Sequence, residues 1–229
     1  MSQPSAQPHS VGVLVPSGML GAGFDPATII RGLSLGADVI AVDGGSTDSG
    51  PYYLGTGEAK TADRAVRRDL RLLLKAASEA GIPLIVGSCG TGGTDAGVWW
   101  VAAIVHEICA EDGLDLKVAK IYSEQRAAEL LPRLRDNRIH PLAPSGPLDA
   151  ATLQRCSHIV AMMGHEPIEL ALRGGADVVL AGRARAPAGA ESARLPAGFP
   201  RLRGTGDGRR GRRRRSRCPR RQGRCHRVR

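Results

Sequence analysis

Short apolar runs alternate with longer amphipathic stretches at least five times between residues 11 and 183, and this alternation strongly constrains the fold. A strand buried in a parallel sheet reads as a continuous run of Val, Ile and Leu, and a helix usually connects it to the next parallel strand. The pattern therefore predicts an α/β fold in three layers, with a mainly parallel sheet between helices. The expected strands cover residues 11–15, 39–42, 84–87, 116–121, 159–162 and 178–181.

Capping residues indicate where several helices begin. Asp25 precedes Pro26, the favoured order of an N-cap and a first helical residue. Thr61 is expected to cap a long amphipathic helix that ends at Gly81. Further helices are expected over residues 95–110, around residues 130–134, over residues 149–155, and from Glu166 onward.

Charge is unevenly distributed along the chain, with a strongly basic stretch after a mildly acidic one. Residues 184–229 hold 16 Arg, no Lys and two acidic residues, whereas residues 1–183 hold 16 basic and 20 acidic residues. The Arg-rich stretch has too few apolar side chains to offset its chain entropy, so we expect it to be disordered. The prediction is a disordered N-terminus over residues 1–10, an α/β domain over 11–183, and a disordered basic tail over 184–229.

Two interpretations of the basic tail remain open. Its charge suits contacts with nucleic-acid phosphates, but Phe199 is its one aromatic residue for stacking on bases, so such binding would be non-specific. Alternatively, sixteen Arg without Lys is the composition expected of GC-rich coding DNA read out of frame. The tail would then be a frameshifted or truncated product.

The cysteines and the hydropathy suggest a cellular compartment. Five Cys show no paired spacing, and no apolar run approaches the roughly 20 residues that cross a bilayer. No signal peptide precedes them, so we expect a reduced, cytoplasmic setting and no membrane partner.

Three Gly-rich loops follow three successive expected strands, at residues 18–23, 44–57 and 87–93. Glycine lets backbone N–H groups approach an anion, and the helix after each loop adds a positive dipole end. Because the carboxyl ends of parallel strands share one edge of a sheet, the loops predict a cleft for a small anionic substrate there. The expected ligand-binding residues are Gly18, Gly21, Gly23, Gly44, Gly45, Ser46, Thr47, Lys60, Ser88, Gly90, Gly92 and Gly93.

Four charged residues near strand ends are the candidates for catalysis: Asp43, Asp48, Glu166 and Arg183. The carboxylates could act as bases, and Arg183 could clamp a carboxylate of the substrate. Asp and hydroxyl groups could also hold Mg²⁺, so metal dependence stays open and no resident cofactor is named. The alternative is that Asp43 and Asp48 cap turns, as Asp commonly does.

Cys89 precedes a helix N-terminus, which can lower the pKa of a thiol and create a nucleophile. The alternative is a small buried residue.

Three segments together resemble a known family: VPSGMLGAGF at residues 15–24, DVIAVDGGSTDSGPYYLGTG at residues 38–57, and GADVVLAGR at residues 175–183. They look like the acyclic terpene utilisation (AtuA) family of bacterial catabolic proteins, in consistent order over about residues 11–184. The resemblance implies a small acid or acyl-CoA substrate, with CoA as part of that substrate, and a small partner subunit. It also implies a Tyr/Ser-Asp-Pro run and a second large portion after Arg183, and residues 185–229 do not match these.

Three functions follow as hypotheses. The first is an enzyme of the lyase or hydratase type acting on a small carboxylate or acyl-CoA, such as a terpenoid acid derivative; a truncated chain would lack whatever the missing portion adds to the site. The second is a non-catalytic subunit or anion-binding module of a catabolic complex. The third is non-specific nucleic-acid binding through the tail.

Overall fold

The computed structural model describes residues 11–46, 49–184 and 226–228. Its centre is a sheet in which every neighbouring pair of strands is parallel, so the predicted α/β fold is confirmed. From one edge to the other, the strands are β1 (Val13–Leu14), β2 (Val39–Asp43), β3 (Leu84–Gly87), β5 (Val178–Ala181), β4 (Val118–Ile121) and β6 (His226–Val228).

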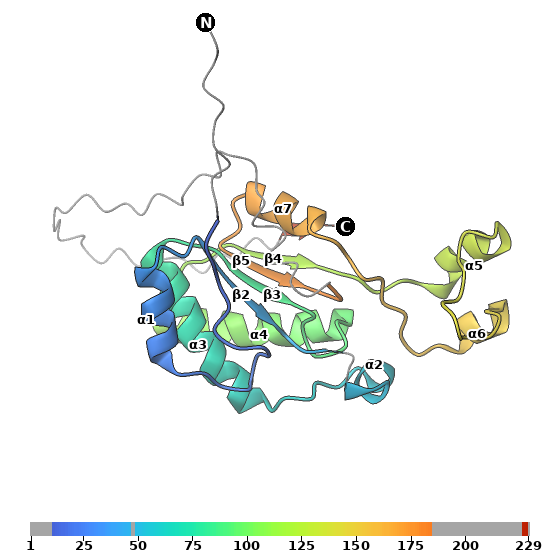
Figure 1. Ribbon diagram of the computed structural model, residues 1–229, viewed down its shortest axis with the longest axis horizontal. Coiled ribbons are helices and arrows are strands. Elements are labelled where there is room, and N and C mark those ends of the chain that lie inside the picture. The colour runs from blue at the N-terminus through green and yellow to red at the C-terminus, as the bar shows by residue number, and fades with distance from the viewer. Residues whose placement is uncertain (1–10, 47–48, 185–225, 229) are drawn as a thin grey trace, which may run out of the picture.

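Helices cover both faces of this sheet (Figure 1). On one face lie α1 (Pro26–Ser34), α3 (Asp63–Ala80) and α4 (Asp95–Asp112), and on the other lies α7 (Glu166–Arg173). Strand residues alternate between two hydrophobic clusters: Ile40 packs toward α3 and α4, whereas Ala41 packs toward α7. This alternation explains why the central strands read as unbroken apolar runs.

One of the predicted helix caps is present and the other is not. Asp25 Oδ1 accepts the N–H of Ala27 at 2.9 Å, as expected. The prediction that Thr61 caps α3 is wrong, because the N-cap is Ala62. Thr61 lies one residue before the N-cap position, and its side chain packs beside Gly21. A Cβ added to Gly21 would lie 2.9 Å from Thr61 Cβ.

The strand predicted over residues 159–162 is absent. Val160 forms an isolated antiparallel bridge with Glu124, and Met163 forms an isolated parallel bridge with Ala184. This stretch instead closes a long excursion, residues 125–159, which we call the arm. The arm carries α5 (Ala127–Arg135) and α6 (Ala150–Arg155), and Figure 1 shows it projecting away from the sheet.

The connection after β2 contains a short helix that the sequence did not indicate, α2 (Tyr52–Thr56). Pro51 takes the N-cap position, and Gly57 ends the helix with a left-handed φ of 73°.

The packed chain reaches just past the predicted domain boundary. Ala184 is buried and pairs with Met163, so the packed chain extends one residue past the expected boundary. Residues 1–10, 185–225 and 229 lie outside the described residues. The predictions of disorder, nucleic-acid binding and a frameshift concern these residues and stay predictions. Within the tail, His226–Val228 pairs with β4 as β6.

Candidate functional site

The loops after β2 and β3 are tied together at the carboxyl edge of the sheet. The N–H of Gly44 donates to Gly87 O at 2.6 Å, and the N–H of Thr91 donates to Gly44 O at 3.2 Å. Asp43 Oδ1 accepts the N–H of Gly45 at 3.2 Å, which is the turn-capping contact weighed as the alternative for this residue. Ser46 is half-buried and ends the described part of this loop, while the predicted site residues Thr47 and Asp48 lie outside the described residues.

Lys60 is held at this edge by its main chain. Its N–H donates to Thr91 Oγ1 at 2.9 Å, and its exposed Nζ donates to Ser49 Oγ at 2.9 Å. Thr91 is buried at a left-handed φ of 70°, an uncommon conformation for a residue with a Cβ. Thr91 therefore fixes the position of the Lys60 main chain, a role that no sequence motif indicated.

Several predicted residues of the loop after β3 serve as packing contacts. Ser88 is buried at a φ of 48°, and its Oγ donates to Ala184 O at 3.2 Å. A Cβ on Gly90 would lie 2.5 Å from Gly97 Cα in α4, and one on Gly92 would lie 3.1 Å from Leu54 Cα in α2. Gly93 accepts the N–H of Arg183 at 3.1 Å. Close backbone approach explains glycine at these positions, so their predicted ligand contacts remain predictions.

Two glycines of the first loop already meet an anion within the chain. Asp69 Oδ2 accepts the N–H groups of Gly21 at 2.8 Å and Gly23 at 3.0 Å. Asp69 is only 1% exposed, and its Oδ1 accepts from Arg68 Nε at 2.9 Å. The acceptor at these two N–H groups is therefore a carboxylate from α3, and the predicted contact of Gly21 and Gly23 with a substrate stays a prediction. At Gly18, the third predicted residue of the loop, nothing lies within 4 Å of the position that a Cβ would occupy.

Cys89 fits the alternative weighed for it, a small buried residue. It is 0% exposed, and burial raises the pKa of its thiol, with nearby Asp43 adding to the effect. A raised thiol pKa is the opposite of what a nucleophilic cysteine needs.

A carboxylate–imidazole pair that no local sequence motif indicates lies at the base of the arm. Glu124 Oε1 is hydrogen-bonded to His158 Nδ1, and both side chains are 24% exposed. The arm brings them together, because its two ends meet where Gln125 N–H donates to Ile159 O at 2.7 Å and Ala161 N–H donates to Ser123 O at 2.8 Å. The two residues stand 34 apart in the sequence, so no local motif could indicate them.

The loop after α2 reaches this pair. A Cβ on Gly57 would lie 3.3 Å from His158 Nε2, the ring nitrogen that points away from Glu124. Because Gly57 has no side chain, the backbone of this loop can approach the imidazole closely. Lys60 follows three residues later, so one short segment connects the Thr91 contact with His158.

Arg183 is positioned by Ser123, a residue that the sequence analysis did not single out. Ser123 is buried, its Oγ accepts the N–H of Arg183 at 2.7 Å, and the same Oγ donates to Gly93 O at 2.8 Å. The main chain of Arg183 thereby joins the loops after β3, β4 and β5 at the same edge as Glu124.

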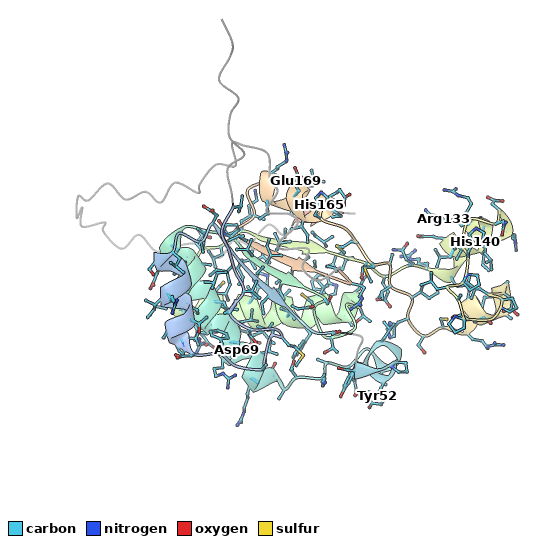
Figure 2. The ribbon with its side chains drawn as sticks, in the orientation of Figure 1. Tyr52, Asp69, Arg133, His140, His165 and Glu169 are labelled. Atoms are coloured by element: carbon cyan, nitrogen blue, oxygen red, sulfur yellow. The ribbon has the colours of Figure 1, made fainter. Side chains whose placement is uncertain are left out.

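Glu166, the remaining predicted catalytic residue, begins α7. Its side chain is 73% exposed, and Oε2 lies 4.0 Å from His165 Nδ1. Figure 2 labels His165, the N-cap of α7, on the face opposite α3 and α4, whereas Glu124 contacts Asp95 at the start of α4. The structure therefore does not link Glu166 to the Glu124–His158 pair, and its catalytic role stays a prediction.

The described residues contain neither a cluster of metal ligands nor a membrane-spanning helix. Among residues 11–46 and 49–184, no group of three or more His, Cys, Asp or Glu is arranged to hold a metal ion. Asp48 lies outside those residues, so magnesium binding stays a prediction. None of the described helices has the length and apolar character that a membrane span requires.

Comparison with known proteins identifies a family for this chain. The family model described as acyclic terpene utilisation family protein AtuA matches residues 55–191, more than half of the 229 residues. The match includes Gly57, Glu124, His158 and Arg183. Searches of curated proteins and of solved structures found no match. On the strength of the family match, the chain belongs to the acyclic terpene utilisation (AtuA) family.

Proposed function

We propose that this protein is a catabolic enzyme that moves a proton on a small carboxylate or acyl-CoA, such as a terpenoid acid derivative, by lyase or hydratase-type chemistry. The observation that carries the proposal is the hydrogen bond between Glu124 Oε1 and His158 Nδ1 at the carboxyl edge of the sheet. His158 is the general acid–base and Glu124 orients its ring.

The chemistry of a carboxylate–imidazole pair supports these roles. A carboxylate bonded to Nδ1 favours the tautomer with the hydrogen on Nδ1, which leaves the Nε2 lone pair to take a proton from a substrate. Both side chains are half-buried, so a substrate can reach the ring while the hydrogen bond is partly screened from water. Proton transfer of this kind typically accelerates a reaction by about 10²–10⁴-fold.

Two cationic residues at the same edge of the sheet suit an anionic substrate. Lys60 is held at the same edge through Thr91, and the main chain of Arg183 is fixed through Ser123. In this proposal Lys60 and Arg183 bind the carboxylate of a free acid or the phosphates of a CoA ester. His158 then acts on the carbon next to the carbonyl group, where a proton is most readily removed.

Deuterium exchange gives a direct test. Purified protein is incubated in D₂O with a panel of short carboxylates and CoA esters, and deuterium at the α-carbon is measured by NMR. We expect exchange with at least one compound, and a loss of about 10²–10⁴-fold in His158→Gln. His140→Gln is the matched control, because His140 lies on the arm, away from the sheet (Figure 2). Full exchange in His158→Gln would contradict the assigned role.

A non-catalytic anion-binding subunit is the second candidate, and the contact between Asp43 and Gly45 favours it, because this carboxylate caps a turn. Such a subunit would be stabilised by the same anions in a thermal-shift assay and would show no exchange by itself. Co-expression with the small product of a neighbouring gene separates the two candidates. Exchange that appears only in the complex, and survives Asp43→Asn, would identify a subunit.

A further inference from the structure

Asp95, the first residue of α4, contacts Glu124 in two ways. Its N–H donates to Glu124 Oε2 at 3.0 Å, and its Oδ1 accepts the N–H of Glu124 at 3.2 Å. These reciprocal bonds hold both the main chain and the carboxylate of Glu124. We call the two bonds together the Asp95 clamp.

The two oxygens of the Glu124 carboxylate have different partners, and the clamp holds one of them. Oε2 is bonded to Asp95 and Oε1 to His158. Both oxygens belong to one planar carboxyl group, so holding Oε2 restricts the positions that Oε1 can take. His158 is held independently by the base of the arm, where Gln125 N–H donates to Ile159 O. The geometry between Glu124 and His158 therefore depends on the position of Asp95.

Contacts one helical turn further along keep α4 and β4 in register. Asp95 and Trp99 share a face of α4, and Lys120, Tyr122 and Glu124 alternate along the chain on the side that meets it. The Trp99 and Tyr122 ring centroids lie 6.0 Å apart, and Lys120 Nζ lies 3.6 Å from the Trp99 ring centroid. The helix start is thus supported by packing that does not involve the clamp.

We propose that Asp95 is a positioning residue that, through Glu124, keeps His158 in the tautomer with its hydrogen on Nδ1 and its Nε2 directed to the substrate. This inference rests on the proposed function, in which His158 moves the proton. Asp95 acts only through Glu124, so its effect is on the orientation and tautomer of the imidazole.

Two variants remove the clamp in steps, and a third keeps it. Asp95→Asn keeps both the N–H donor and a side-chain oxygen that can accept from Glu124. Asp95→Ala removes the acceptor. Asp95→Pro removes the acceptor and the donor, yet proline is favoured at the first position of a helix. The preceding Thr94 has φ −68° and ψ 160°, which suits a residue before proline.

The tautomer is measured by ¹⁵N NMR on protein labelled at histidine, with His158→Gln used to assign the resonance. We expect the Nδ1–H form in the wild type and in Asp95→Asn, a mixture in Asp95→Ala, and mainly the Nε2–H form in Asp95→Pro. Trp99→Phe is the matched control, because it changes the same helix–strand contact and leaves the clamp intact, so its tautomer should match the wild type. Where exchange activity is present, kcat should fall about 10–100-fold in Asp95→Pro with little change in KM.

The outcomes separate the two proposals. A folded Asp95→Pro or Asp95→Ala protein with an unchanged His158 tautomer overturns the role of Asp95, and a lower Tm without a change of tautomer identifies a purely structural residue. If Asp95→Pro does not fold, the mixture expected in Asp95→Ala decides the question. If the tautomer shifts as expected but no protein exchanges deuterium, the Asp95 inference about tautomer control stands and the proposed function falls.

Discussion

At the scale of single residues, Asp69 shows how a buried carboxylate can organise a loop. It accepts hydrogen bonds from Gly21, Gly23 and Arg68, and it lies on the α3 side of the sheet, far from the arm (Figure 2). A buried donor without an acceptor costs roughly 1–3 kcal/mol. The Asp69 carboxylate therefore links the loop after β1 to the core.

Replacing Asp69 by Ala leaves the N–H groups of Gly21 and Gly23 without their acceptor. We expect the free energy of unfolding to fall by about 2–4 kcal/mol, measured by urea denaturation. Asp63→Ala is the control, because Asp63 is exposed in the first turn of the same helix and contributes about 0.3–1 kcal/mol through the dipole. Equal effects of the two substitutions would show that the Asp69 contacts do not stabilise the fold.

Cys89 should resist alkylation while the protein is folded. A raised pKa means less thiolate at any given pH, so raising the pH from about 7 to 9 should leave Cys89 unlabelled. Cys156 is exposed and should react with iodoacetamide over the same range, as peptide mass spectrometry would show. Cys89 should become labelled once urea unfolds the protein. Labelling of both residues at one rate in the folded protein would contradict the burial of Cys89.

At the scale of elements, the loop after β3 depends on a close contact with α4. A Cβ on Gly90 would lie 2.5 Å from Gly97 Cα, and Gly90 has a φ of 69°. Gly90→Ala should therefore lower the free energy of unfolding by about 2–5 kcal/mol, combining the left-handed backbone and the overlap.

Gly113→Ala isolates the backbone part of that cost. Gly113 has a similar φ of 66° at the end of α4, and nothing lies within 4 Å of the position that an added methyl group would occupy. We expect a loss of about 1–2 kcal/mol there. If both alanine variants lose the same free energy in denaturant titrations, the contact between Gly90 and Gly97 contributes nothing.

The elements were predictable to the extent that local patterns determine them. The apolar run before Asp43 predicts β2 because a buried parallel strand must be apolar on both faces. Residues 159–162 have a similar apolar character, yet they form no strand of the sheet, because Val160 pairs with Glu124 where the arm begins and ends. Pairing of this kind depends on residues distant in the sequence, which local periodicity does not report.

The candidate site was predictable in place but only partly in its residues. The carboxyl edge of the sheet follows from the fold, and Asp43, Lys60 and Arg183 all lie along it. Glu124 and His158 were missed because only the folded arm makes them neighbours. Glycine amides suggested an anion, but the sequence could not reveal that Asp69 supplies one to Gly21 and Gly23.

At the scale of the whole molecule, the arm is weakly tied to the rest. Its helices pack mainly on each other, and Leu130 and Leu153 are the buried side chains among its residues, all of which are described. So little buried apolar surface cannot hold a structure of this length firmly. The arm should open without unfolding of the sheet.

Hydrogen exchange measures that difference. Amides in α5 and α6 should exchange through openings that cost on the order of 2 kcal/mol less than those of β3 and β5. Mass spectrometry of peptides from residues 127–135 and 178–181 gives the comparison. Identical protection in the two regions would mean that the arm and the sheet unfold as one unit.

The position of β5 between β3 and β4 affects how the chain folds during synthesis. The ribosome delivers β3 and β4 before β5, yet Leu84 and Val118 both pair with Val178. At about 5–20 residues per second, the stretch from β3 to β5 takes on the order of 5–20 s to emerge. Throughout that interval the edge of β3 that pairs with β5 is open and the apolar side chains of β3 are incompletely covered. We therefore expect the nascent chain to be bound by chaperones until β5 leaves the exit tunnel.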